Sequence, residues 1–418
     1  MKKMIIEGNK KLTGKINISG AKNSAVALIP AALLSNGIVK IDNVPNISDV
    51  DALIEILEYL NAKVTLVNGH MEIDTRCVVN REIPNEISSK LRASYYFMSA
   101  LLGKYKEVTM YFPGGCSIGA RPIDQTLKGY KALGANVLEE DGKFRVTADK
   151  LKGNTVYLDM PSVGATINTM LASVKAQGKT IIENAAKEPE IVNVAIFLNN
   201  MGANIQGAGT SRIIIKGVEE LNDGYVEVIP DRIEAGTYII LGALVGDKLE
   251  IANIIPEHID NLLYKLKEME ADIEILDNSV IVSYKENIKP VNIKTLGYPG
   301  FPTDLQQPIT VLLTQCNGKS ILNETIYENR FKNIPYLQDM NADIKIINNQ
   351  KIEIHGISKL SGNVVEATDL RAGACLVLAA LKANGKTIIN NVDYVLRGYE
   401  NIVDKLKNIG AVISIVDE

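Results

Sequence analysis

Chemically reactive residues gather in the segment PGGCSIGARPID, residues 113–124, where a cysteine follows two glycines and precedes an arginine. Glycines allow the backbone to bend tightly, and the cation of Arg121 favours the thiolate form of the nearby Cys116. These features are typical of a loop that carries a reactive cysteine. A surface turn with an incidental small residue is the alternative that this segment alone leaves open.

The other cysteines and the histidines do not indicate a metal site. Cys77, Cys316 and Cys375 are far from Cys116 and from one another, and no C-x-x-C spacing occurs. This distribution predicts neither a zinc site nor a disulfide framework. The three histidines, also widely separated, are His70, His258 and His355. Catalysis by histidine and metal binding by histidine are therefore disfavoured.

The composition is that of a globular protein with more than one domain. The chain has 418 residues, which is too long for one ordinary hydrophobic core. Apolar residues make up 46% and charged residues 22%, and the net charge of −4 argues against nucleic-acid binding. Neither a signal-peptide pattern nor a membrane-spanning run is apparent, so we expect a cytoplasmic protein without membrane insertion.

An internal repeat of about 70 residues sets the architecture that must position the reactive residues. Similar helix ends recur at six alanines: Ala62, Ala135, Ala203, Ala271, Ala342 and Ala411. Six glycines recur in phase with them and precede short apolar strands: Gly37, Gly103, Gly178, Gly246, Gly318 and Gly385. The chain is therefore predicted to contain six copies of one unit.

Each copy is predicted to run helix, strand, helix, strand. The first helix is apolar nearly all round, as in AVALIPAALL, TYIILGALV and ACLVLAALK, which indicates burial on most faces. The second is amphipathic, as in DVDALIEILEYL, and should cover a surface. We therefore predict an α/β fold with two domains of three copies each, in which sheets lie outside a bundle of buried helices.

Polar residues stand at the predicted starts of the buried helices, where free N–H groups and a partial positive charge favour anions. Together with these starts, six cationic residues indicate a site for a heavily anionic ligand, and they are Lys22, Arg92, Arg121, Arg330, Arg371 and Arg397. The alternative is that the polar residues at these positions are helix caps and surface ion pairs.

The order of these motifs resembles that of a known family over essentially the whole chain. The motifs are SGAKNSA, PGGCSIGARPID, SVGAT, ENAAKEPEI, PDRIEAGT, FPTDLQ, ENRF, ATDLRA and RGYE. They are similar to those of the UDP-N-acetylglucosamine 1-carboxyvinyltransferases, which belong to the enolpyruvyl transferases. The resemblance implies two inverse α/β barrels, formed by residues 21–229 with the Cys116 loop and by residues 1–20 and 230–418. It places the active site in the cleft between them.

The resemblance also implies an activity. The enolpyruvyl group of phosphoenolpyruvate would pass to the 3′-hydroxyl of UDP-N-acetylglucosamine with release of phosphate, as the first committed step of peptidoglycan synthesis. The expected partners are these two small-molecule substrates, with no nucleic acid and no cofactor or metal. The family's sensitivity to the epoxide antibiotic fosfomycin is expected as well.

Site residues follow from matching this sequence to the family motifs. The catalytic residues would be Cys116, Asp304, Lys22 and Arg397. Phosphoenolpyruvate would be bound by Lys22, Asn23, Cys116, Arg121, Arg330, Asp369, Arg371 and Arg397. UDP-N-acetylglucosamine would be bound by Asn23, Arg92, Arg121, Pro122, Ile123, Asp124, Gln125, Met160, Pro161, Ser162, Val163, Gly164, Asp304 and Ile326.

Three positions depart from the family pattern. Relatives usually have histidine at Thr126, some have lysine at Met160, and many have histidine and aspartate in the segment that here ends in Leu396. These departures concern nucleotide binding and the C-terminal segment. Two alternatives therefore remain: an enolpyruvyl transferase with another hydroxyl acceptor, such as the shikimate-pathway enzymes that lack the cysteine loop, or a silent paralogue that binds UDP-sugar and regulates wall synthesis.

Overall fold

The computed structural model describes residues 2–112 and 123–417, which form two compact units. We call residues 20–112 and 123–229 the inserted unit, and residues 2–19 and 230–417 the terminal unit. Each unit has its own hydrophobic core. Cys116, Arg121 and Pro122, which the sequence singled out, lie outside the described residues.

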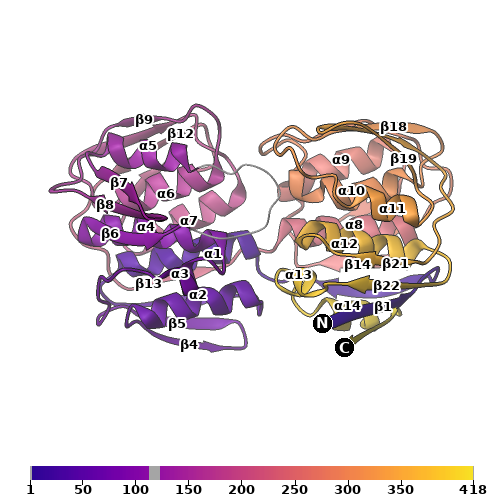
Figure 1. The fold of residues 1–418 in the computed structure, drawn as a ribbon, viewed down its shortest axis with the longest axis horizontal. Helices are drawn as coiled ribbons and strands as arrows, with labels where there is room; N and C mark the ends of the chain where they lie inside the picture. Colours follow the sequence, from indigo (N-terminus) through magenta and orange to yellow (C-terminus); the bar gives the residue numbers. More distant parts are fainter. Residues whose placement is uncertain (1, 113–122, 418) are drawn as a thin grey trace. The chain divides into compact units, whose positions relative to one another are not determined.

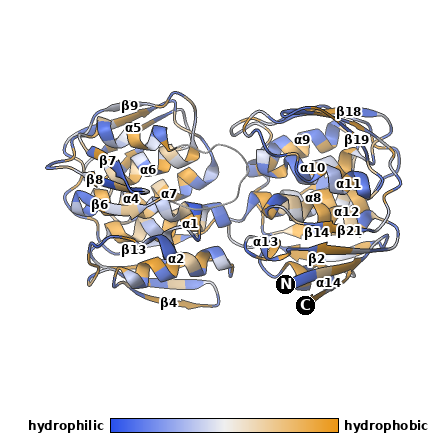
Figure 2. Cartoon of the chain, in the orientation of Figure 1, coloured by the Kyte–Doolittle hydropathy of each residue, from blue (hydrophilic) through white to orange (hydrophobic). Residues whose placement is uncertain are grey.

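Buried helices form the interior of each unit, and strands surround them (Figure 1). In the inserted unit these helices are α1 (Lys22–Ala31), α4 (Tyr95–Tyr105) and α6 (Val163–Ser173). In the terminal unit they are α8 (Arg232–Val245), α10 (Gln306–Leu313) and α12 (Leu370–Lys382). Every residue of α8 is buried, and Figure 2 shows the hydrophobic colouring of this interior.

The remaining helices are shorter or cover a surface. The surface helices are α2 (Ser48–Tyr59), α5 (Asp124–Ala132), α7 (Pro189–Asn200), α9 (Asp260–Glu268), α11 (Ile334–Asp339) and α14 (Ile402–Asn408). Single turns occur at α3 (Asn85–Ser88), α13 (Asp393–Leu396), η1 (Ala32–Leu34), η2 (Arg92–Ser94), η3 (Pro256–Ile259) and η4 (Thr303–Leu305). Among the described residues, no helix combines the length and the apolar character needed to cross a membrane.

The described residues form six sheets with one shared pattern, in which a central strand pairs in parallel with a short edge segment and antiparallel with one strand of an antiparallel pair. This pair is a hairpin in five sheets, and in the sixth it joins the first and last strands of the chain, β1 and β23. The sheets of the inserted unit are β13 (Gly224–Glu227), β3 (Ile38–Asp42), β5 (His70–Asp74) and β4 (Lys63–Val67); β11 (Asn204–Gln206), β12 (Arg212–Lys216), β10 (Lys179–Glu183) and β9 (Thr155–Tyr157); and β6 (Glu107–Tyr111), β8 (Lys143–Thr147) and β7 (Asn136–Glu140). In the three-stranded sheet a parallel bridge from Ile83 to Met110 takes the place of the edge strand.

The sheets of the terminal unit follow the same order. They are β15 (Asp272–Ile275), β16 (Ser279–Ser283), β14 (Gly246–Ala252) and β2 (Leu12–Asn17); β17 (Ile293–Lys294), β18 (Lys319–Asn323), β20 (Lys351–His355) and β19 (Asp343–Asn348); and β21 (Val364–Glu366), β22 (Lys386–Asn390), β1 (Lys2–Glu7) and β23 (Val412–Asp417). The predicted α/β fold of six repeats with buried helices and outer sheets is confirmed.

The repeated alanines mark one helix-ending geometry. In all six copies the alanine N–H donates to the carbonyl five residues earlier, at 2.9–3.0 Å, and the residue before the alanine has a positive φ. This is the Schellman arrangement, which favours glycine or asparagine at the left-handed position. Glycine or asparagine occupies it in five copies and Glu270, with φ 57°, in the sixth. The sequence repeat is therefore a repeat of backbone geometry.

Two details of the predicted repeat are wrong. Each copy contains further strands beyond the predicted pattern, namely a second hairpin strand and, in most copies, a parallel edge strand. In addition, Gly103 lies inside α4 rather than directly before a strand. Its missing side chain serves packing there, because a Cβ at Gly103 would lie 2.8 Å from the carbonyl oxygen of Leu171 in α6.

Among the described residues, the chain passes between the units at residues 19–20 and 229–230. On the terminal side of these passages the Asp231 N–H donates to the Ser19 carbonyl at 2.9 Å. On the inserted side the Ala21 N–H donates to the Ile229 carbonyl at 2.7 Å. The segments that enter and leave each unit are thus joined by hydrogen bonds.

Candidate active site

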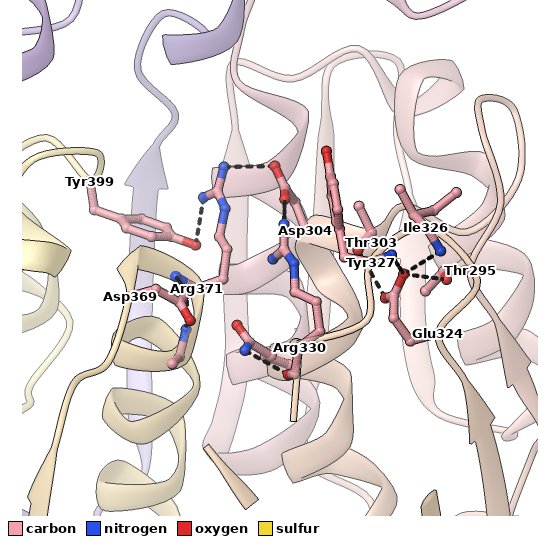
Figure 3. A network of polar contacts seen from close by, with 12 residues as sticks. Thr295, Thr303, Asp304, Glu324, Ile326, Tyr327, Arg330, Asp369, Arg371 and Tyr399 are labelled. Atoms are coloured by element: carbon pink, nitrogen blue, oxygen red, sulfur yellow. Dashed lines mark hydrogen bonds and ion pairs between the residues drawn. The ribbon is translucent and has the colours of Figure 1, made fainter. Parts of the chain in front are cut away.

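Asp304 in the terminal unit accepts hydrogen bonds from two buried arginines (Figure 3). Its Oδ1 lies 2.8 Å from Nη2 of Arg330, and its Oδ2 lies 3.2 Å from Nη2 of Arg371. Asp304 belongs to η4, which leads into the buried helix α10, and Arg371 lies in the first turn of α12. Two helix starts far apart in sequence therefore place their charged residues together.

The side chain of Asp304 is not a helix cap. The residue before η4 is Pro302, and neither η4 nor α10 has a side-chain cap. Burial alone would raise the pKa of Asp304, but the charges of Arg371 and then of Arg330 hold this pKa well below its usual value. Asp304 is therefore a carboxylate held by cations, which contradicts the cap interpretation for this residue.

Arg330 has hydrogen-bond donors that no described residue accepts from. Its side chain is almost fully buried, and its Nε and Nη1 atoms have no hydrogen-bond partner among the described residues. Leaving such donors unsatisfied in a buried position is costly, so a ligand that accepts from them would be stabilised. Planar, permanently charged guanidinium groups suit carboxylates and phosphates. This part of the site can therefore hold an anion.

Asp369 and Tyr399 support the neighbouring Arg371. Asp369 caps α12 by accepting from the N–H groups of Arg371 and Ala372, at 2.8 and 3.0 Å. Its other oxygen, Oδ2, is buried and has no partner among the described residues. Arg371 Nη1 donates to the Tyr399 hydroxyl at 3.2 Å, and that hydroxyl is 2.9 Å from Thr237 Oγ1. The sequence analysis did not find Tyr399, although it lies in the quoted motif RGYE.

Arg397 and Ile326 are the remaining predicted residues of the terminal unit. Arg397 directly follows α13 and is partly exposed, and Ile326 lies in the segment after β18, where its side chain is exposed. Leu396, one of the departures from the family pattern, packs against the hydrophobic core. The apolar residue at that departure therefore has a packing role.

In the inserted unit, Lys22 at the start of α1 pairs with Asp49 near the start of α2. Lys22 Nζ lies 2.6 Å from Asp49 Oδ2, and both side chains are largely buried. Asn23 follows in the first turn of α1 and is partly exposed. The sequence analysis did not find Asp49, because an acidic residue in the first turn of a helix is common and gives no distinctive signal.

The predicted nucleotide-binding residues of the inserted unit lie near one another. Gln125, in the first turn of α5, accepts from the Asp159 N–H at 2.9 Å, next to the exposed Met160. Ser162 caps α6 by accepting from the Ala165 N–H at 3.2 Å. The Gln125–Asp159 contact brings the start of α5 close to the segment 160–164.

Arg92 lies against Tyr95, whose hydroxyl approaches Gly164 in α6. The Arg92 guanidinium carbon lies 5.9 Å from the Tyr95 ring centroid, and a Cβ at Gly164 would lie 1.9 Å from the Tyr95 hydroxyl. Gly164 is therefore required for the close approach of Tyr95 to α6. Thr126, another departure from the family pattern, is buried within α5, so its side chain does not face solvent beside this group.

The described residues contain no cluster of three or more histidine, cysteine, aspartate or glutamate side chains that could hold a metal ion. The chemically capable residues among those described lie in both units. The terminal unit holds a carboxylate with arginines, and the inserted unit holds a lysine–aspartate pair and a polar segment at two helix starts.

Comparison with known proteins places the chain in a family. The family model described as EPSP synthase (3-phosphoshikimate 1-carboxyvinyltransferase) matches residues 6–406. The chain is 51% identical to UDP-N-acetylglucosamine 1-carboxyvinyltransferase 2 of Listeria monocytogenes, over 99% of this chain and 97% of that one. It is 49% identical to the protein of the same name from Streptococcus thermophilus, over the full length of both.

Solved structures agree with the observed fold. The enolpyruvyl transferase NikO from Streptomyces tendae superposes with a TM-score of 0.90, at 24% identity and 99% coverage of both chains. EPSP synthase from Acinetobacter baumannii gives a TM-score of 0.77, at 17% identity and full coverage of both chains. From its sequence relatives and its fold together, the chain belongs to the enolpyruvyl transferases and, among them, to the family of the UDP-N-acetylglucosamine 1-carboxyvinyltransferases.

Proposed function

We propose that this chain transfers the enolpyruvyl group of phosphoenolpyruvate to the 3′-hydroxyl of UDP-N-acetylglucosamine and releases phosphate, as the first committed step of cytoplasmic peptidoglycan synthesis. The inserted and terminal units would be its two barrel domains. The observation that carries the proposal is the Asp304 carboxylate between Arg330 and Arg371, in a chain about half identical to enzymes of that name.

The chemistry requires an acid and a base. In the addition step the sugar oxygen forms a bond to C2 of phosphoenolpyruvate and loses its proton, while C3 gains a proton. In the elimination step C3 loses a proton and the bond from C2 to the phosphate oxygen breaks, which restores the double bond. Cys116, outside the described residues, is proposed as the acid at C3.

Asp304 is proposed to act on the sugar hydroxyl. While both arginines bind it, its low pKa makes it a hydrogen-bond acceptor and a poor base. A substrate carboxylate that accepted from Arg330 and Arg371 would draw those cations away from Asp304 and raise its pKa. Binding of phosphoenolpyruvate would thus prepare Asp304 to receive the hydroxyl proton.

The remaining predicted residues are proposed to bind the two substrates. Lys22, Arg121 and Arg397 would bind the phosphate group of phosphoenolpyruvate, with Asn23 and Asp369 beside it. The nucleotide would be held by the group around Arg92, the segment 121–125 and the segment 160–164, while Ile326 contacts the sugar. This assignment follows from the family resemblance and agrees with the clustering seen within each unit.

A phosphate-release assay tests the proposal. With phosphoenolpyruvate and UDP-N-acetylglucosamine we expect steady phosphate release, and with shikimate 3-phosphate as the acceptor we expect none. Release with shikimate 3-phosphate alone would instead identify another acceptor. If neither acceptor supports release while UDP-N-acetylglucosamine still binds in calorimetry, the chain is a silent paralogue.

A further inference from the structure

The fifth repeat differs from four of the others at one junction. In four copies an asparagine with positive φ follows the central strand, and its side-chain amide donates at 2.6–2.8 Å to an acceptor at or just after the end of the parallel edge strand. These residues are Asn43, Asn184, Asn253 and Asn391. After β18 the corresponding residue is Glu324, which is fully buried. A buried carboxylate therefore replaces an amide at this junction.

The Glu324 carboxylate accepts four hydrogen bonds (Figure 3). Its Oε1 accepts from Thr295 Oγ1 at 3.0 Å and from the N–H groups of Ile326 and Tyr327 at 2.8 and 3.2 Å. Its Oε2 accepts from Thr303 Oγ1 at 2.8 Å. A carboxylate has acceptor sites for four donors, whereas an asparagine amide has one oxygen and adds two donors.

Through these contacts Glu324 is connected to both Asp304 and Arg330. Thr303 directly precedes Asp304, so its side-chain bond to Glu324 holds the backbone that carries Asp304. On the other side, Tyr327 is held by its N–H, and the Arg330 guanidinium carbon lies 5.1 Å from its ring centroid. The ion pair between Asp304 and Arg330 closes this ring of contacts.

We propose that Glu324 is a positioning residue of the active site, which fixes Asp304 and Arg330 relative to each other and holds the Ile326–Tyr327 backbone beside them. This inference rests on the proposed function, because it assigns Glu324 to the same reaction. Glu324 has no exposed surface and so acts through its neighbours. Misplacement of reacting groups by about 1 Å can cost about 10²-fold in rate.

The test compares three variants of the full chain. Glu324→Asn introduces the residue found in four other repeats but is one methylene too short to hold both Thr303 and Tyr327. Glu324→Gln keeps the length, and the Thr303 hydroxyl can turn to accept from the new amide. Gln315→Leu is the control, because Gln315 is also buried and hydrogen-bonded, but it lies beyond the other end of α10.

We expect Glu324→Asn to lower kcat/KM for UDP-N-acetylglucosamine by about 10²-fold, and Glu324→Gln to retain most of it. Gln315→Leu should lower Tm and leave kcat/KM unchanged at a temperature where all variants are folded. The proposal is overturned if Glu324→Asn resembles Gln315→Leu, or if Glu324→Gln is as impaired as Glu324→Asn. Should Glu324→Asn fail to fold, Thr303→Val replaces it in the same kcat/KM comparison, because it removes only the hydrogen bond from Thr303 to Glu324.

Failure of the proposed function can be distinguished from failure of the positioning role of Glu324. If the wild-type chain releases no phosphate, the affinity for UDP-N-acetylglucosamine in calorimetry replaces kcat/KM as the measurement. A weaker affinity in Glu324→Asn than in Gln315→Leu would still support positioning of the Ile326–Tyr327 segment. Equal affinities, or no binding by the wild type, would overturn the inference.

Discussion

Lys22 Nζ lies 2.6 Å from Asp49 Oδ2 inside the inserted unit, where the two side chains are 14% and 5% exposed. Removing one partner of such a pair leaves the other charge without its counterion and costs about 3–5 kcal/mol, whereas replacing both partners with apolar residues is often nearly neutral. A role in binding phosphate and a role in stability can therefore be separated at this pair.

We expect Lys22→Met to lower both the unfolding free energy and the affinity for phosphoenolpyruvate. The double variant Lys22→Met/Asp49→Leu should recover the unfolding free energy and remain inactive. Urea denaturation and phosphate release measure the two properties. Recovery of turnover in the double variant would show that Lys22 serves the fold alone.

Asp304→Asn should be both slow and less stable. The change removes the carboxylate that compensates Arg330 and Arg371, so Tm should fall. Loss of the group that acts on the sugar hydroxyl should lower kcat by about 10²-fold or more. Steady-state kinetics would measure kcat and a melting curve would measure Tm. Calorimetry would check that UDP-N-acetylglucosamine still binds. A kcat near that of the wild type would leave the catalytic assignment with Cys116 alone.

The fold was predictable where backbone geometry demands particular residues. The left-handed helix ends restrict residue choice to glycine or asparagine in most copies, so they repeat visibly in the sequence. The missed strands carry no such signal. Edge strands such as β9 are only three residues long, and β4 has no fully buried residue, since it alternates only between exposed and half-buried positions.

The site was predictable as far as single charged residues stand out. Asp304 and Arg371 are unusual at the starts of buried helices, and the structure brings them together with Arg330. Their supporting residues gave weaker signals. Glu324 could have been found only by aligning the six repeats against one another, since its distinguishing feature is a carboxylate at a position where four of them have asparagine.

The four thiols should differ in reactivity. Burial raises the pKa of Cys316 and of Cys375 to about 12, so both remain protonated near neutral pH, while Cys77 is exposed. We expect fosfomycin to add to Cys116, as peptide mapping would show, and phosphoenolpyruvate to compete with it. Cys77→Ser is the control and should leave labelling intact, and Cys116→Asp should resist the drug yet keep activity. Equal labelling of Cys77 would contradict this expectation.

The pH dependence of stability should report on Glu234 in α8. Burial raises its pKa from 4.5 to about 7, against the opposing effect of Lys405, whose Nζ is 2.6 Å from Glu234 Oε1. A carboxyl with a raised pKa stabilises the fold at low pH, and this contribution is lost as the pH rises from about 4.5 through about 7.

The matched variant for this pH effect is Glu234→Gln. Its unfolding free energy should equal that of the wild type near pH 4, exceed it increasingly up to about pH 7 by at most about 1.4 kcal/mol per pH unit, and keep a constant difference above that pH. Urea titrations at several pH values would measure the difference. A wild type that gains on the variant as the pH rises would show that the Lys405 ion pair outweighs burial.

Because the two described crossings between the units lie next to each other, the gene segment for one unit can be removed and the ends of the other unit joined. Because the Ser19 carbonyl already contacts the Asp231 N–H, a linker of one or two residues could replace residues 20–229 without moving either end. The excised segment would be a continuous polypeptide with its own core. Either unit could then be produced alone, isotopically labelled in isolation or exchanged between relatives, which makes this large chain accessible as two modules of ordinary domain size.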